Sequence, residues 1–90
     1  MRSILQRDKC CYICKTEQGL HLHHCIHGTA NRKLADEDGL TVWLCWRHHQ
    51  EVHANADLDN TFKYIAQMEY QHQNNKTTEE WIQRYGKSWM

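Results

Sequence analysis

The sequence predicts a small α+β fold in which metal ligands hold two strands and a helix together, with further helices behind them. Its 90 residues suffice for one domain, which we take to span residues 1–90. All five cysteines and seven of the eight histidines fall within residues 1–54. A domain of this size buries only about 60–65% of its unfolded surface, so its apolar core is thin and a metal ion is the expected reinforcement.

The metal-binding core is expected over residues 10–54. In residues 20–26, Leu-His-Leu-His-His-Cys-Ile, side chains alternate with a period of two, which predicts a strand. The polar residues 28–39 are expected to form a loop with at most a brief helical turn. Residues 40–44, Leu-Thr-Val-Trp-Leu, are β-branched and aromatic and predict a second strand. Residues 46–53 contain no helix breaker and predict a short helix.

A longer helix is expected over about residues 58–73. Asp57 or Asp59 is the expected N-cap. One face of the helix should carry an apolar stripe. The stripe consists of Leu58, Phe62, Ile65 and either Met68 or Glu69.

A last helix is expected over about residues 78–86. Thr77 and Glu80 have the spacing of a capping box, and Gly86 stands where a left-handed residue would end the helix. The predicted apolar face, which should pack on the rest of the domain, consists of Trp81, Ile82 and Tyr85.

Composition excludes several classes of protein. No stretch approaches 18 apolar residues, so no membrane-spanning helix is expected. Residues 1–9 lack an apolar segment of the kind found in secretory signals, so we expect a cytoplasmic protein whose cysteines are thiolates. Eleven basic and eleven acidic residues give a net charge of zero, which excludes a simple polycation wrapped around nucleic acid.

Four residues have the spacing of a structural zinc site. Cys11 and Cys14 are separated by two residues, and so are Cys45 and His48. Two such pairs match the four tetrahedral ligands that Zn²⁺ prefers. The alternative is that these cysteines are incidental.

The zinc ligands leave two choices open. Cys10 stands next to Cys11, although the two-residue gap favours Cys11. His49 stands next to His48, and the same spacing favours His48 for zinc.

Four more histidines form a second group. His49 and His53 are four residues apart, so on a helix they share one face and can bind one metal ion. His23 and His24 are adjacent on a strand and point to opposite sides, so one can ligate the ion while the other stays free. A free imidazole beside a metal-bound phosphate is suited to act as a general base near neutral pH. The neighbouring His21 and His27 are expected to be ordinary strand and loop residues.

Residues 22–28 (Leu-His-His-Cys-Ile-His-Gly), Asn31, and residues 44–53 (Leu-Cys-Trp-Arg-His-His-Gln-Glu-Val-His) resemble the HNH endonucleases of the ββα-metal, or His-Me finger, superfamily. The resemblance covers about residues 10–54 and includes the zinc pairs that many of these proteins carry. Residues 78–89 resemble the tail of small HNH-like proteins encoded by bacteriophages and prophages.

The resemblance implies a role for each matching residue. His24 would be the general base that activates water, and Asn31 would orient that base or hold its loop. As in colicin-type nucleases, three histidines would bind a catalytic Mg²⁺, Mn²⁺, Ni²⁺ or Zn²⁺ ion, namely His23, His49 and His53. DNA would be cleaved, by nicking or across both strands, to leave a 5′-phosphate and a 3′-hydroxyl.

DNA is therefore the expected partner. Arg32, Lys33 and Arg47 lie around the predicted site and are candidates for phosphate binding, with a solvated surface as the alternative. Two other functions compete with the nuclease. One is a non-catalytic, zinc-stabilised nucleic-acid-binding module, and the other is an accessory factor that interacts with phage recombination or packaging proteins.

Overall fold

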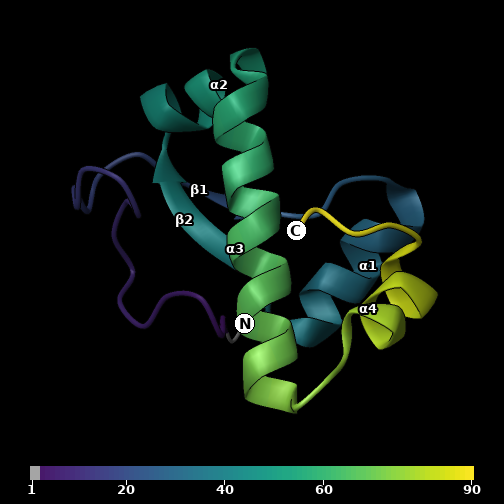
Figure 1. Ribbon diagram of the computed structural model, residues 1–90. Coiled ribbons are helices and arrows are strands. Elements are labelled where there is room, and N and C mark those ends of the chain that lie inside the picture. Colours follow the sequence, from purple (N-terminus) through teal and green to yellow (C-terminus); the bar gives the residue numbers. More distant parts are fainter. Residues whose placement is uncertain (1–2) are drawn as a thin grey trace.

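The computed structural model describes residues 3–90 and confirms the α+β class (Figure 1). Within these residues there is a two-stranded sheet with one helix between its strands and three helices after them. None of the helices in residues 3–90 is long and apolar enough to span a membrane. In chain order, the elements are β1 (Leu20–His24), α1 (Thr29–Asp38), β2 (Thr41–Cys45), α2 (Trp46–Ala54), α3 (Ala56–Asn74) and α4 (Thr78–Tyr85).

The two strands are antiparallel, with Leu20 opposite Cys45 and His24 opposite Thr41. Val42 and Leu44 of β2 are fully buried and form the centre of the core. The first strand ends at His24, two residues earlier than the alternation predicts. The chain bends away there toward Gly28, whose φ of +99° is a conformation that residues with a side chain rarely adopt.

The prediction that residues 28–39 form a loop with at most a helical turn was wrong. The segment is a helix of ten residues that ends at Gly39, which has a φ of +74°. Ala35 is its one fully buried residue and Leu34 is half-buried. A helix with so narrow an apolar face lacks the periodic signal on which the prediction depends.

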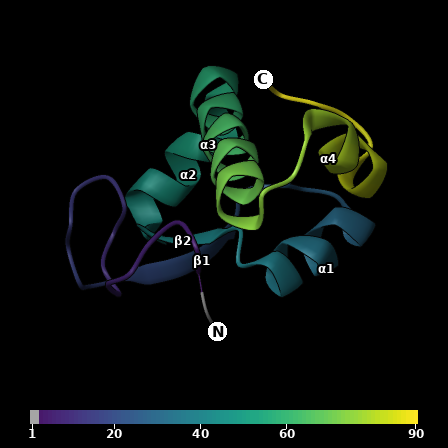
Figure 2. The ribbon, with the colours of Figure 1, turned by 60° about the horizontal axis from the view of Figure 1, so that its bottom comes forward.

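Helix α3 runs between two groups of elements (Figures 1 and 2). The sheet and α2 lie on one side of it, and α1 and α4 lie on the other. Its N-cap is Asn55, whose side chain accepts a hydrogen bond from the Leu58 N–H at 3.1 Å. The prediction of Asp57 or Asp59 as the cap was wrong. Both aspartates lie in the first turn, where a carboxylate interacts favourably with the helix dipole.

The buried stripe of α3 differs from the predicted one. Phe62 is buried as expected, but Met68 is 39% exposed, and the stripe continues through Ala66 and Tyr70 at intervals of four residues. Gln67 is also fully buried. Its amide bonds to the Ser88 hydroxyl and accepts from the backbone N–H of Trp89, which ties the C-terminal residues to α3.

Helix α4 begins and ends as predicted. Thr77 and Glu80 form both hydrogen bonds of the capping box, and Gly86 closes the helix with a φ of +89°. Trp81 and Tyr85 are buried, and their rings stack at a centroid distance of 4.1 Å. Ile82 is 39% exposed, so its predicted place on the apolar face was wrong. Two aromatic residues one turn apart fill the contact by themselves.

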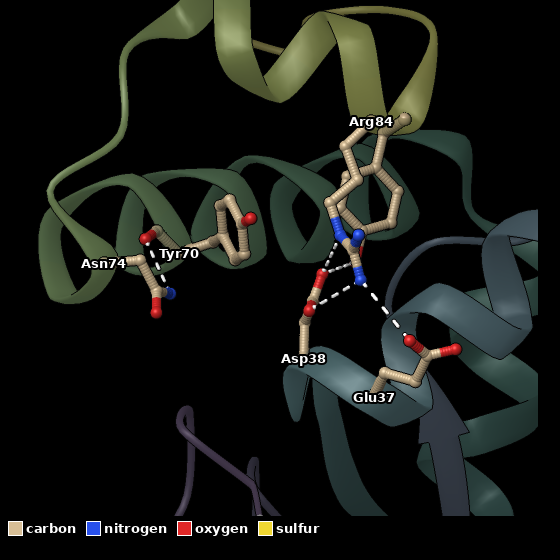
Figure 3. A network of polar contacts seen from close by, with 6 residues as sticks. Glu37, Asp38, Tyr70, Asn74 and Arg84 are labelled. Atoms are coloured by element: carbon tan, nitrogen blue, oxygen red, sulfur yellow. Dashed lines mark hydrogen bonds and ion pairs between the residues drawn. The ribbon is translucent and has the colours of Figure 1, made fainter.

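A half-buried carboxylate joins α1 to α4 (Figure 3). Asp38 accepts two hydrogen bonds from Arg84, at 2.6 and 2.9 Å, and a third from the Tyr85 hydroxyl. The bonds to Asp38 raise the pKa of Arg84, so the guanidinium keeps its charge. Asn31 adds a weaker bond, donating its amide to the Tyr85 carbonyl at 3.4 Å. These contacts fix the position of α1, which has little apolar surface of its own.

The Asp38→Asn variant should lose about 1 to 3 kcal/mol of unfolding free energy, because the amide cannot pair with Arg84 and Tyr85 as the carboxylate does. Urea denaturation measures the loss. Glu37→Gln is the matched control, because Glu37 is exposed and lies 3.7 Å from Arg84. Equal stabilities of the two variants would show that the contact does not hold α1.

Candidate metal centres

Three cysteines and a histidine gather where the N-terminal loop meets the end of β2. Cys11 and Cys14 lie in the loop, Cys45 ends β2, and His48 lies in the first turn of α2. One ligand atom from each of the four lies within 4.8 Å of all the others. Residues predicted from spacing alone are therefore brought together, and the cluster is a possible site for a structural metal such as zinc.

The distances between these atoms fit a tetrahedral ion. His48 Nδ1 lies 3.2 Å from Cys45 Sγ and 3.5 Å from Cys11 Sγ, while the sulfurs of Cys14 and Cys45 are 3.9 Å apart. Sulfur and nitrogen atoms bound to one Zn²⁺ ion lie about 3.3 to 3.8 Å from each other. Of the two alternatives at each position, the cluster contains Cys11 and His48 and not Cys10 or His49.

The surroundings of Cys11 favour its thiolate. Burial raises the pKa of this thiol, but hydrogen bonds from the backbone N–H groups of Cys14, Cys45 and Ile13, and one from His48, outweigh burial and lower the pKa to about 6. The thiolate is the form that binds metals. Cys11 is therefore ready to act as a ligand at neutral pH.

A second cluster lies between β1 and α2. Ligand atoms of His23, His49 and His53 lie within 4.8 Å of one another. The Nε2 atoms of His49 and His53 face each other at 3.2 Å, close to the separation of about 3.3 Å expected for two nitrogens on one tetrahedral ion. The four-residue spacing therefore brings the two imidazoles together on one face of α2, as predicted.

His23 is the central member of this cluster. It is 1% exposed, and its Nε2 atom has no hydrogen-bond partner among residues 3–90. Burial, followed by the nearby His27, His49 and His53, lowers the pKa of His23 to about 3, so the ring is neutral. A buried nitrogen without a partner costs stability, and a neutral imidazole nitrogen is a good metal ligand. These residues fit a divalent ion.

Neighbouring polar residues also contact the histidines of this cluster. His21 was expected to be an ordinary strand residue, but its Nδ1 lies 3.3 Å from Nδ1 of His49. This contact occupies the ring nitrogen of His49 that faces away from His53 and so fixes its orientation. His27 pairs with Asp59 of α3 at 2.7 Å, and both lie within ligand distance of His23. No sequence pattern links residues so far apart.

A cavity of about 480 Å³ opens beside the second cluster. His24 lies on its wall, and its Nε2 contacts Asp36 Oδ1 of α1 at 2.6 Å. The wall consists of Leu22, His23, His24, His27, Gly28, Thr29, Arg32, His49 and His53. The strand therefore brings both members of the histidine pair to one cavity, and Asp36 is a neighbour that the sequence analysis did not find.

The other predicted residues lie in different places. Arg32 lines the cavity, whereas Lys33 is exposed on α1 and is not part of the wall. Arg47 lies beside Cys14 and Cys45 in a separate hollow. Asn31 contacts α4 and is not part of the cavity wall. Of the three basic candidates, Arg32 alone is placed to meet a ligand in this cavity.

Comparison with known proteins adds no relative. No protein-family model, curated protein or solved structure matches this chain.

Cys14→Ser should abolish zinc binding and unfold much of the chain, because the free energy of metal binding is part of the free energy of folding at such a site. Zinc content by mass spectrometry and far-UV circular dichroism measure the two effects. Cys10→Ser is the matched control, because Cys10 adjoins the cluster without belonging to it. A Cys14→Ser protein with native ellipticity and thermal midpoint would contradict the structural role.

His23 should make the domain less stable in acid. Its pKa is lowered from 6.5 to about 3 by folding, so the unfolded chain binds the proton first and stability falls as the pH drops below 6.5. Urea denaturation at about pH 7 and about pH 5.5 should therefore show a smaller loss for His23→Leu than for wild type. Equal losses in the two proteins would show that His23 is not held neutral by the fold.

Proposed function

We propose that this chain is a metal-dependent endonuclease of the HNH type that hydrolyses phosphodiester bonds in DNA. The observation that carries the proposal is the buried, unpartnered Nε2 of His23 beside His49 and His53, at a cavity that His24 also lines. Three convergent imidazoles suit a divalent ion, and a fourth beside them suits a general base. A binding module stabilised by the cysteine cluster alone has no need of this second group.

The proposed metal ligands come from two elements of the fold. His23 lies on β1, while His49 and His53 lie on one face of α2. A divalent ion bound by them would supply positive charge next to the scissile phosphate and the leaving 3′ oxygen. Arg32 on the cavity wall is exposed to solvent, so a phosphodiester can approach from that side.

His24 is the proposed general base. Its Nε2–H donates to Asp36, which leaves Nδ1 with the lone pair that accepts a proton from the attacking water. The oxygen of that water bonds to phosphorus as the bond from phosphorus to the 3′ oxygen breaks, and the leaving oxygen takes a proton from solvent. The His24 side chain is 12% exposed, so it is sheltered yet accessible from the cavity.

Arg32 is the proposed phosphate contact. It lines the cavity from the first turn of α1, where backbone N–H groups without helical partners also attract an anion. The net charge of the whole chain is zero, so binding to DNA should be weak, salt-sensitive and independent of base sequence. Cleavage in the cell would then depend on a partner or on the local concentration of DNA.

The decisive experiment is relaxation of supercoiled plasmid by chain that holds one equivalent of zinc, with Mg²⁺, Mn²⁺ or Ni²⁺ added. Wild type should nick the plasmid only with added ion. His24→Ala should lower the rate at least about 100-fold, because a positioned base contributes about 10² to 10⁴. The loss should occur without loss of fold or of metal binding.

His72→Ala is the matched control, because His72 is an exposed histidine at the far end of α3. It should cleave as wild type does. If folded wild type is inert toward plasmid, single-stranded and branched DNA with all three ions, the nuclease proposal fails, and the non-catalytic binding module replaces it.

A further inference from the structure

His23 belongs to two sets of potential ligands, and only one of them matches the proposed nuclease site. The first set consists of three imidazoles, from His23, His49 and His53. In the second set, His23 is joined by His27, which follows β1, and by Asp59 of α3. The second set therefore draws on a helix that lies outside the strand–strand–helix core.

His27 and Asp59 form a hydrogen bond that lies within ligand distance of His23, so an ion could take the place of the shared hydrogen. His27 Nε2 lies 2.7 Å from Asp59 Oδ1, and ligand atoms of both lie within 4.8 Å of one from His23. Nitrogen and oxygen atoms bound to one tetrahedral ion lie about 3.4 Å apart, so the two atoms would move apart when an ion replaces the hydrogen bond. Lys63 holds the other carboxylate oxygen at 3.1 Å, which leaves Oδ1 directed at His27.

The carboxylate of Asp59 distinguishes this set from the three imidazoles of the first set. Asp59 is about one-fifth exposed, so its charge is partly removed from water. A carboxylate in such surroundings gains from a nearby cation.

We propose that His23, His27 and Asp59 form a second divalent-ion position, which shares His23 with the three-imidazole position and is occupied in competition with it. A neutral imidazole has one lone pair, so His23 can bind one ion at a time. The cavity would thus hold a single exchangeable ion in either of two places. This inference extends the metal site of the proposed function and rests on it for the role of His49 and His53.

The two positions differ in chemistry, and this difference decides which ion takes which place. Three imidazoles favour Ni²⁺ and Zn²⁺, whereas a set that includes a carboxylate is better suited to Mn²⁺. The affinity for Mn²⁺ should therefore depend on His27 and Asp59, and the affinity for Ni²⁺ should depend on His49 and His53. A single shared position would make both ions depend on the same residues.

The test is the affinity of the full chain, loaded with one equivalent of zinc, for each ion alone. Loss of the free Mn²⁺ signal in electron paramagnetic resonance gives the Mn²⁺ affinity, and calorimetry gives the Ni²⁺ affinity. Asp59→Asn and His27→Ala should each weaken Mn²⁺ binding by at least about 10-fold and change Ni²⁺ binding by less than about threefold. His53→Ala should show the reverse pattern.

Asp57→Asn is the matched control, because Asp57 lies in the same turn of α3 and is exposed. It should leave both affinities unchanged. The proposal is overturned if Asp59→Asn leaves Mn²⁺ binding intact. It is also overturned if that variant weakens the binding of both ions equally, because Asp59 would then only orient a ligand of a single position that both ions share. If the variants show the expected Mn²⁺ and Ni²⁺ affinities but the wild-type chain does not cleave DNA, only the proposed nuclease activity is refuted.

Discussion

The attachment of the N-terminal loop to the junction of β2 and α2 is the interaction on which the rest of the structure depends. Cys11 and Cys14 come from the loop, and Cys45 and His48 come from the junction. Successive residues of a helix point about 100° apart, so when His48 faces the cysteines His49 is turned toward β1. The orientation of α2 is thereby set, and the second cluster follows from the first.

Much of this arrangement could be predicted from the sequence because its signals are local. The strands, the helix after Cys45 and the capping box at Thr77 all depend on residues within a few positions of one another. The Cys-Cys and Cys-His pairs are equally local in the sequence. Cysteine and histidine are also the side chains that zinc prefers, so few other residues compete with them as ligands. The choice of Cys11 over Cys10 followed from spacing alone, and Cys11 is the one that lies in the possible metal cluster.

The features that escaped prediction depend on contacts between distant segments. Helix α1 has a narrow apolar face, and its position depends on Asp38 meeting Arg84 near the other end of the chain. Likewise, Asp59 looked like a helix cap, and nothing in its neighbourhood pointed to His27. The sequence also suggested Asn31 as a site residue, but its amide contacts α4 instead. Spacing shows which residues can share a face of one element, but not which elements meet.

The clamp between α1 and α4 also bears on the order in which the protein takes shape during synthesis. Chains are made from the N-terminus, so every histidine and cysteine of both clusters leaves the ribosome before Arg84 does. The side chains of both clusters can therefore come together while α1, which carries Asp36 and Arg32, is still unanchored. The wall of the cavity would thus be completed only after the histidines that it encloses are in place.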